Sequence, residues 1–186
     1  MIIFDLDDCL ADCDHRKHLI DPHRYREICE YSNYRMVNGD PLLDLGGKAS
    51  WRYKSTGEPF DIGFKPFYKS CDKDKPILET IYQFRSIKEI LGLKDLQIWS
   101  GRCESVREET EDWLKLHVSC WGEYLPKVKM RQIGNETPLE LLKSKWMNEA
   151  LEKGSTIDYV FDAHKKSISM WRSRGVFVFN CIRPNW

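Results

Sequence analysis

At 186 residues, the chain is expected to form one domain that has room for a smaller inserted unit. Its 29 basic and 29 acidic residues cancel, which excludes a globally basic protein but leaves a local basic groove open. No apolar run approaches the ~20 residues that a membrane-spanning helix needs, so no membrane partner is expected. Seven cysteines occur without Cys-x-x-Cys spacing, so we predict reduced thiols in a cytoplasmic protein rather than a zinc site or disulfide framework.

The first predicted strand, Ile2–Phe4, runs directly into Asp5 and Asp7. Open α/β sheets place their reactive groups where a buried parallel strand ends. Two acids at positions i and i+2 of an extended backbone point the same way, and their like charges require a shared proton or a metal cation. Asp-x-Asp is therefore the first candidate catalytic motif; the alternative is a strand end with solvated acids.

Residues 12–75 interrupt this pattern, because they mix glycine and proline with many aromatic residues. A structureless loop of that length is unusual in a compact domain, so we predict a small cap. The predicted organisation is a core of residues 1–11 and 76–186 with a cap of residues 12–75. Trp51, Tyr53 and Phe64 can stack on a nucleobase, worth ~1–3 kcal/mol per base, or form the core of the cap itself, which is the commoner role.

Helices and strands alternate through the rest of the chain, beginning with a helix over residues 77–91. Ser105 and Glu108 form a potential capping box for the next helix. The alternation predicts an α/β fold with a doubly wound parallel sheet between helical layers. The later predicted strands are Leu96–Trp99, Leu125–Met130, Tyr159–Phe161 and Val176–Phe179, and the helices between them are 105–117, 137–152 and 165–174.

Polar residues follow two of the later strands. Ser100, Gly101 and Arg102 offer a hydroxyl, backbone amides and a guanidinium, which together can hold phosphate oxygens. Asp162 ends another strand, where the alternative role is an ordinary helix N-cap. Because parallel strands bring their carboxyl ends to one edge of a sheet, these groups are expected to converge on Asp5. Several carboxylates with waters suit Mg²⁺, which prefers oxygen ligands in octahedral geometry.

The order of these groups resembles the haloacid dehalogenase (HAD) superfamily of phosphatases. Its first motif, Asp-x-Asp-x-(Thr/Val/Cys)-Leu, matches residues 5–10, and Ser100 and Asp162 match its second and fourth motifs. The resemblance implies a Rossmann-like three-layer fold, with Asp5 as the nucleophile and Asp7 as the general acid/base. It also implies that Mg²⁺ is held by the Asp5 side chain, the Asp7 backbone carbonyl and Asp162.

A closer resemblance, to phage-type polynucleotide kinase 3′-phosphatase domains, covers roughly residues 77–181. It rests on the runs at 100–114, 130–135, 141–143 and 161–175. Aligning Leu-Leu-Lys selects Lys143 rather than Lys145 as the lysine of the third motif. Ala163 departs from the family, which has a second acid there, and Asn135 replaces the usual aspartate. The sequence contains no kinase P-loop, so a bifunctional enzyme is not expected.

The resemblance implies a Mg²⁺-dependent phosphomonoesterase that acts through an aspartyl-phosphate on a nucleotide or a nucleic-acid 3′-phosphate. Gly101, Arg102, Arg107 and Arg131 are the predicted substrate contacts, although Arg107 and Arg131 are equally suited to surface salt bridges. A 5′-(deoxy)nucleotidase acting on free monophosphates is the first alternative. A catalytically impaired nucleotide- or nucleic-acid-binding protein is the second, and Ala163 is the feature that favours it. The oligomeric state stays open.

Overall fold

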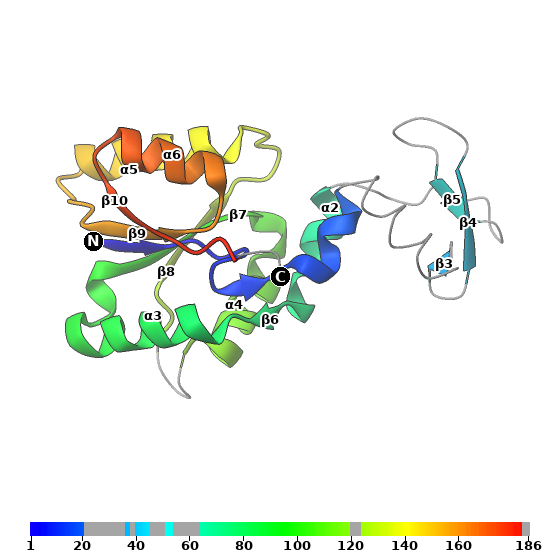
Figure 1. Ribbon diagram of the computed structural model, residues 1–186, viewed down its shortest axis with the longest axis horizontal. Helices are drawn as coiled ribbons and strands as arrows, with labels where there is room; N and C mark the ends of the chain where they lie inside the picture. Colours follow the sequence, from blue (N-terminus) through cyan, green and yellow to red (C-terminus); the bar gives the residue numbers. More distant parts are fainter. Residues whose placement is uncertain (21–35, 38–39, 45–50, 54–63, 120–123, 184–186) are drawn as a thin grey trace. The chain divides into compact units, whose positions relative to one another are not determined.

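The computed structural model describes residues 1–20, 36–37, 40–44, 51–53, 64–119 and 124–183. The chain divides into two compact units (Figure 1). Unit 1 joins Met1–Cys13 to Asp74–Trp186, and unit 2 is Asp14–Lys73. Among the described residues, no helix combines the length and apolar character that crossing a membrane requires.

Unit 1 is built on a five-stranded sheet in which every neighbouring pair of strands is parallel. The order is β10-β9-β1-β7-β8, so the short strand β1 lies at the centre with Phe4 opposite both Ile98 and Phe161. This arrangement confirms the predicted doubly wound α/β fold. The strands are β1 (Ile2–Phe4), β7 (Leu96–Cys103), β8 (Lys127–Arg131), β9 (Tyr159–Asp162) and β10 (Phe177–Asn180).

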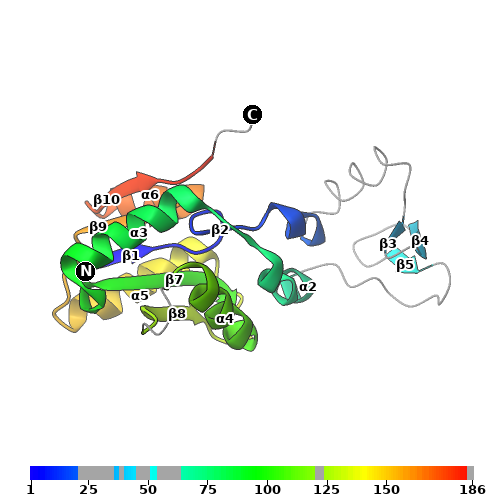
Figure 2. The same ribbon diagram turned by 90° about the horizontal axis from the view of Figure 1, so that it is seen from below.

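Helices cover both faces of this sheet, which gives three layers (Figures 1 and 2). One face packs on α3 (Leu78–Leu91) and α4 (Arg107–His117), and the other on α5 (Leu139–Glu152) and α6 (Lys165–Ser173). Successive side chains of a strand alternate between faces. Phe4 accordingly belongs to the core on the α3–α4 side, and Ile3 to the core on the α5–α6 side. By the same alternation, the side chain of Asp5 is directed toward α5 and α6.

The start of α4 differs from the predicted capping box at Ser105. The 3-10 turn η4 (Glu104–Val106) precedes the helix. The N-cap residue of α4 is Val106, whose side chain has no polar atom. The prediction was wrong because Ser105 lies inside the turn rather than at its end. Unit 1 also contains the 3-10 turn η3 (Leu93–Asp95) and a two-stranded antiparallel sheet of β2 (Ala11–Asp12) and β6 (Lys75–Pro76).

Unit 2 contains a three-stranded antiparallel sheet and several short helical turns. The buried Arg16 lies with its guanidinium carbon 4.0 Å from the centre of the Phe67 ring, and its Nη1 donates to the Phe67 carbonyl at 3.0 Å. This cation–π contact joins the first helical turn of the unit to its last helix. The elements are η1 (Asp14–Leu19), β3 (Met36–Val37), β4 (Asp40–Asp44), β5 (Trp51–Tyr53), α2 (Phe64–Lys69) and η2 (Cys71–Lys73).

Candidate active site

A tight turn after β1 fixes Asp5 and the residues that follow it. The Asp5 amide donates to the Phe161 carbonyl at 2.8 Å, which continues the parallel pairing beyond Phe4. The Leu6 carbonyl then accepts three backbone amides, from residues 9, 10 and 11, and Asp8 adopts the left-handed conformation with φ of 60°. Aspartate tolerates this conformation better than most residues do. The backbone around the Asp-x-Asp motif is therefore closed by its own hydrogen bonds.

Lys143 connects Asp5 to Asp162 in the interior of unit 1. Its ammonium lies 2.9 Å from Asp5 Oδ2 and 2.8 Å from Asp162 Oδ2. The three residues are exposed by only 3% (Asp5), 1% (Lys143) and 0% (Asp162). Asp5 follows β1, Lys143 lies in α5 and Asp162 ends β9; we call these three residues the lysine centre. The fold therefore brings together three of the predicted site residues. Of the two candidate lysines of the third motif, Lys143 is buried and Lys145 is exposed.

Neighbouring N–H groups hold the two carboxylates of the lysine centre in place. The Leu6 amide donates to Asp5 Oδ1 at 2.9 Å, and the His164 amide donates to Asp162 Oδ1 at 2.9 Å. The indole of Trp171, from α6, donates to Asp162 Oδ2 at 3.0 Å. Charge-assisted hydrogen bonds of this kind are stronger than neutral ones, so they restrain the carboxylate oxygens of Asp5 and Asp162.

The charges of the lysine centre do not balance when both carboxylates are ionised. Burial raises the pKa of Asp5 well above its ordinary value of 3.8; Lys143 lowers it in part, and the charge of Asp162 raises it further. Burial also raises the pKa of Asp162, but Lys143 and the His164 amide outweigh it and bring the net value below the ordinary one. Asp5 therefore binds a proton more readily than an ordinary aspartate does when no second cation is present.

The donor set of the lysine centre fits a divalent cation. Two buried carboxylates share one ammonium, so one negative charge remains for a bound cation to balance. All the side-chain donors are hard oxygens, which suits Mg²⁺ better than a soft metal. Asp5 and Asp162 supply these oxygens, and the expected part of the Asp7 carbonyl in holding such an ion stays a prediction.

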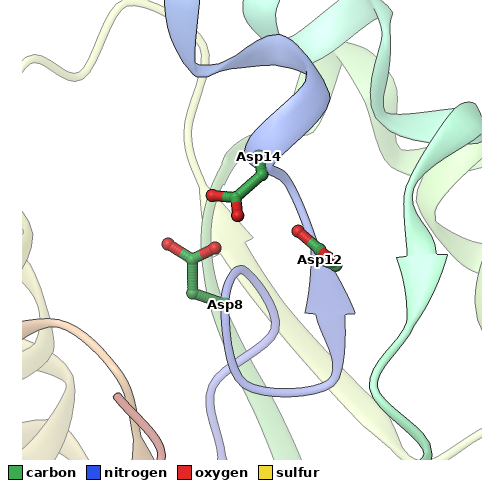
Figure 3. Close-up of side chains that lie close together, drawn as sticks. All are labelled: Asp8, Asp12 and Asp14. Atoms are coloured by element: carbon green, nitrogen blue, oxygen red, sulfur yellow. The ribbon is translucent and has the colours of Figure 1, made fainter. Parts of the chain in front are cut away.

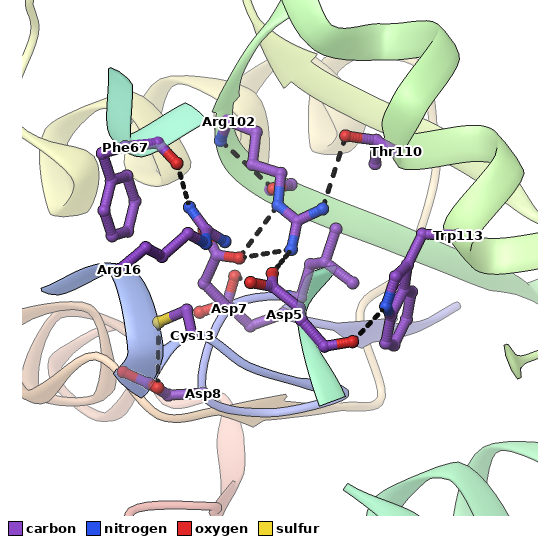
Figure 4. A network of polar contacts seen from close by, with 12 residues as sticks. Asp5, Asp7, Asp8, Cys13, Arg16, Phe67, Arg102, Thr110 and Trp113 are labelled. Atoms are coloured by element: carbon purple, nitrogen blue, oxygen red, sulfur yellow. Dashed lines mark hydrogen bonds and ion pairs between the residues drawn. The ribbon is translucent and has the colours of Figure 1, made fainter. Parts of the chain in front are cut away.

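Asp7 takes part in a second buried network, around Arg102 (Figure 4). Arg102 donates from Nε and Nη2 to Asp7 Oδ1, at 2.9 Å and 2.7 Å. Its Nη2 also lies 2.5 Å from Asp74 Oδ2, and its Nη1 donates to the Thr110 hydroxyl at 3.4 Å. The side chains of Arg102 and Asp74 are fully buried, whereas that of Asp7 is 23% exposed. We call Asp7, Arg102 and Asp74 the arginine centre.

The other residues of the second motif lie close to these two centres. Ser100 is buried in β7, and its hydroxyl accepts the Arg102 amide at 3.1 Å. A Cβ on Gly101 would come within 3.1 Å of a Leu139 methyl group, so glycine permits the first turn of α5 to approach β7 closely. The Gly101 carbonyl accepts from Arg131 Nε at 3.0 Å.

Arg131 and Arg107 make contacts within unit 1. Besides its bond to Gly101, Arg131 donates from Nη1 to the carbonyls of Asn135 and Thr137, at 3.1 Å and 2.5 Å, which ties β8 to the segment before α5. Arg107 pairs with Glu104 at 2.5 Å and with Glu111 at 2.8 Å, and these carboxylates raise its pKa. A role for either arginine in substrate binding stays a prediction.

Two further acids lie close together near the start of unit 1: Asp8 in the turn after β1, and Asp12 at the end of β2 (Figure 3). Their carboxylate oxygens come within 4.8 Å of one another. Asp12 pairs with Arg183 at 2.9 Å, and Asp8 accepts a hydrogen bond from the Cys13 thiol at 3.0 Å. Arg183 therefore balances the charge of Asp12, whereas Asp8 gains only a hydrogen bond from a neutral thiol.

Sequence reasoning missed Asp74, Trp113 and Trp171. Asp74 stands between Lys73 and Lys75, a pattern that is typical of an exposed turn. Trp113 donates to the Asp74 carbonyl at 2.7 Å, but its helical spacing indicates only a core position. Trp171 lies in the Met-Trp-Arg run that carries the family resemblance, and that run was the available signal for a contact near Asp162.

Comparisons with known proteins identify a family for the chain. The family model for the polynucleotide kinase PNKP phosphatase domain matches residues 59–186. This span includes Ser100, Lys143 and Asp162, whereas Asp5 and Asp7 precede it and join the site through the central position of β1. None of the curated proteins matches the chain.

Two solved structures share the fold. Both are complexes of Pnkp1, Rnl and Hen1, and the first is described as an RNA repair complex. The first matches with 16% identity and a TM-score of 0.57, the second with 17% and 0.59. The matches cover 96% of this chain but only 41% and 44% of the other chains, so this chain spans less than half the length of either. Because the family model matches well over half of the sequence, the chain belongs to the polynucleotide kinase PNKP phosphatase-domain family and is an HAD-type phosphatase.

Proposed function

We propose that the chain is a Mg²⁺-dependent phosphomonoesterase that removes the 3′-phosphate from a nucleic-acid end or a nucleotide. The observation that carries this proposal is the lysine centre, in which one buried ammonium bridges carboxylates from β1 and β9. A buried lysine beside a carboxylate nucleophile can also stabilise the charge of a transferring phosphoryl group. Membership of the family supports a nucleic-acid end as the substrate.

The reaction proceeds in two steps. Asp5 attacks phosphorus through a carboxylate oxygen, the bond from phosphorus to the ester oxygen breaks, and Asp7 gives a proton to the leaving oxygen. Asp7 then takes a proton from water, which attacks the aspartyl-phosphate, releases inorganic phosphate and restores the Asp5 carboxylate. Ser100 and Lys143 hold the nonbridging phosphoryl oxygens during both steps.

Mg²⁺ would be held by Asp5, Asp162 and the Asp7 carbonyl, and it supplies positive charge that favours the ionised form of Asp5. This fits the raised pKa of Asp5, because the protonated acid is a poor nucleophile. Ala163 removes the second acid that the family pattern has at this strand end. Asp162 nevertheless keeps three N–H donors, from Lys143, Trp171 and His164.

The predicted cap, residues 12–75, is proposed to select the substrate. Trp51 and Tyr53, in β5, are the proposed candidates to stack on a base. Phe64 begins α2. Gly101 and Arg102 in β7, together with Arg107 and Arg131, are the proposed contacts of unit 1 with substrate phosphate.

Phosphate release from a panel of substrates tests the proposed function. The panel comprises 4-nitrophenyl phosphate, 3′- and 5′-phosphorylated oligonucleotides, and nucleoside 3′- and 5′-monophosphates, each with and without Mg²⁺. The 3′-phosphorylated oligonucleotide is expected to give the highest kcat/KM, whereas a preference for free 5′-monophosphates would assign a nucleotidase instead. Asp5→Asn is expected to remove activity, and the exposed Asp95→Asn to leave it unchanged. Release no greater than that of Asp5→Asn from every substrate would leave a binding protein as the better assignment.

A further inference from the structure

Asp74 is a buried acid to which the reaction described above gives no role. Its side chain is fully inaccessible, and it contacts the same nitrogen, Arg102 Nη2, that donates to Asp7. A buried ionised carboxylate is costly unless it is paired, so its retention beside Arg102 calls for an explanation. We propose that Asp74 is a positioning residue, which holds Arg102 so that Arg102 in turn orients the general acid/base Asp7; this inference rests on the proposed phosphatase reaction.

The geometry of Arg102 supports an orienting role. The guanidinium is planar, so fixing two of its nitrogens fixes the directions of all its N–H groups. Asp74 holds Nη2, and Thr110 holds Nη1. Nε and Nη2 lie on the third side of the guanidinium, and both donate to Asp7 Oδ1. Since two donors converge on that single oxygen, the position of Oδ1 is held and the Asp7 carboxylate is restrained relative to the sheet.

Asp74 is itself held by α4. The Trp113 indole donates to its backbone carbonyl at 2.7 Å, and Trp113 belongs to the same helix as Thr110 (Figure 4). The orientation of Asp7 is therefore anchored in a helix that packs on the sheet, rather than in the turn that carries Asp7. Catalytic groups whose supporting contacts are fixed in this way lose less of their activity to misorientation.

The guanidinium of Arg102 cannot orient Asp7 and also bind a substrate phosphate with all of its nitrogens. Nε, Nη1 and Nη2 each have a protein acceptor, and the side chain is fully buried. Arg102 is therefore a support for Asp7 rather than the substrate contact that the sequence suggests. The phosphate contacts of the second motif then fall to Ser100 and the neighbouring backbone amides.

The test compares two substrates of similar size whose leaving groups differ. The alkoxide of benzyl phosphate needs a proton from Asp7 as it leaves, whereas nitrophenolate leaves 4-nitrophenyl phosphate without one. The measured quantity is kcat/KM, because it ends at formation of the aspartyl-phosphate and excludes the water step. For Asp74→Ala we expect a loss of about 10- to 100-fold on benzyl phosphate and less than about threefold on 4-nitrophenyl phosphate, within the range that general acid catalysis contributes.

Asp74→Asn keeps an acceptor oxygen for Arg102, so this variant is expected to retain more activity than Asp74→Ala. If Asp74→Ala does not fold, the same comparison of substrates is made with Asp74→Asn. In an Asp7→Asn background, Asp74→Asn should cause no further loss on benzyl phosphate, because residues that act as a unit are not additive. Ile81→Val in α3 serves as a core-destabilised control that should affect both substrates equally.

Two results would overturn the inference while leaving the phosphatase activity intact. One is an equal loss on both substrates in the Asp74 variants, and the other is a full additional loss in the Asp7→Asn background. If the wild-type protein with Mg²⁺ released no phosphate from 4-nitrophenyl phosphate, the proposed function itself would fail, so the two failures are distinguishable.

Discussion

The lysine centre and the arginine centre share one plan but differ in the cation and in the helices that contact it. Each consists of two carboxylates around one buried cation, the first against α5 and α6 and the second against α4. Lysine is a compact point charge, which suits the phosphoryl group, whereas the fork of arginine imposes direction, which suits an acid/base residue. Charge and orientation are therefore supplied separately to Asp5 and Asp7, which a single residue separates.

Removing the cation of the lysine centre is expected to have the largest effect. Lys143→Ala leaves Asp5 and Asp162 buried without their shared partner, which should lower the free energy of unfolding by about 3–5 kcal/mol and abolish phosphate release. Lys145→Ala, on the exposed side of the same helix, is the matched control and should stay within about 0.5 kcal/mol. Urea unfolding measures both variants. Equal effects of the two would mean that Lys143 does not carry the charge balance of the site.

Adding a divalent cation should compensate the excess charge of the lysine centre. At about one hundred times its dissociation constant, Mg²⁺ is expected to stabilise the protein by ~2.7 kcal/mol, or roughly 5–10 °C in Tm. Asp162→Asn should abolish the shift, and Asp12→Asn should keep it, because Asp12 lies in the other acidic pair. Thermal melts at constant ionic strength provide the measurement. Loss of the shift in Asp12→Asn alone would place the cation elsewhere.

Exchanging arginine for lysine tests whether the arginine centre depends on direction. Arg102→Lys keeps the charge but cannot direct donors to Asp7, Asp74 and Thr110 together, so we expect a loss of about 2 kcal/mol in unfolding free energy. The exposed Arg174→Lys should change by less than about 0.5 kcal/mol. Denaturant titration compares the two. If Arg102→Lys matched the control, charge alone would account for the centre.

The smallest expected effect is a pH dependence that belongs to the lysine centre alone. The pKa of Asp5 is raised in the folded state, so its contribution to stability is fully present below the ordinary value of 3.8 and is lost as pH rises through the folded pKa. In EDTA, unfolding free energy should fall by up to about 1.4 kcal/mol per pH unit in that window. Asp5→Asn should remove this slope, and Asp95→Asn should keep it. A slope that survives Asp5→Asn would assign it to another group.

The fold was largely predictable from sequence because apolar strands and helical periods alternate after residue 95. Among the site residues, Asp5 and Asp162 follow predicted strands, so the topology alone brings them to one edge. The choice of Lys143 needed the family alignment, because helical periodicity does not reveal that its ammonium is buried. Asp74 could not be predicted, since its burial depends on Arg102 and Trp113, which are distant in sequence.

The pairing of β2 with β6 has a consequence for how this protein can diversify. Asp12 lies opposite Lys75 and Ala11 opposite Pro76, so the chain leaves and re-enters unit 1 on adjacent strands. With both ends already joined, each doubling of the intervening length adds only ~0.6 kcal/mol of closure entropy. Residues 14–73 are thus an exchangeable module: evolution, or an engineer, can lengthen, shorten or replace this segment at small thermodynamic cost to the sheet that holds both centres.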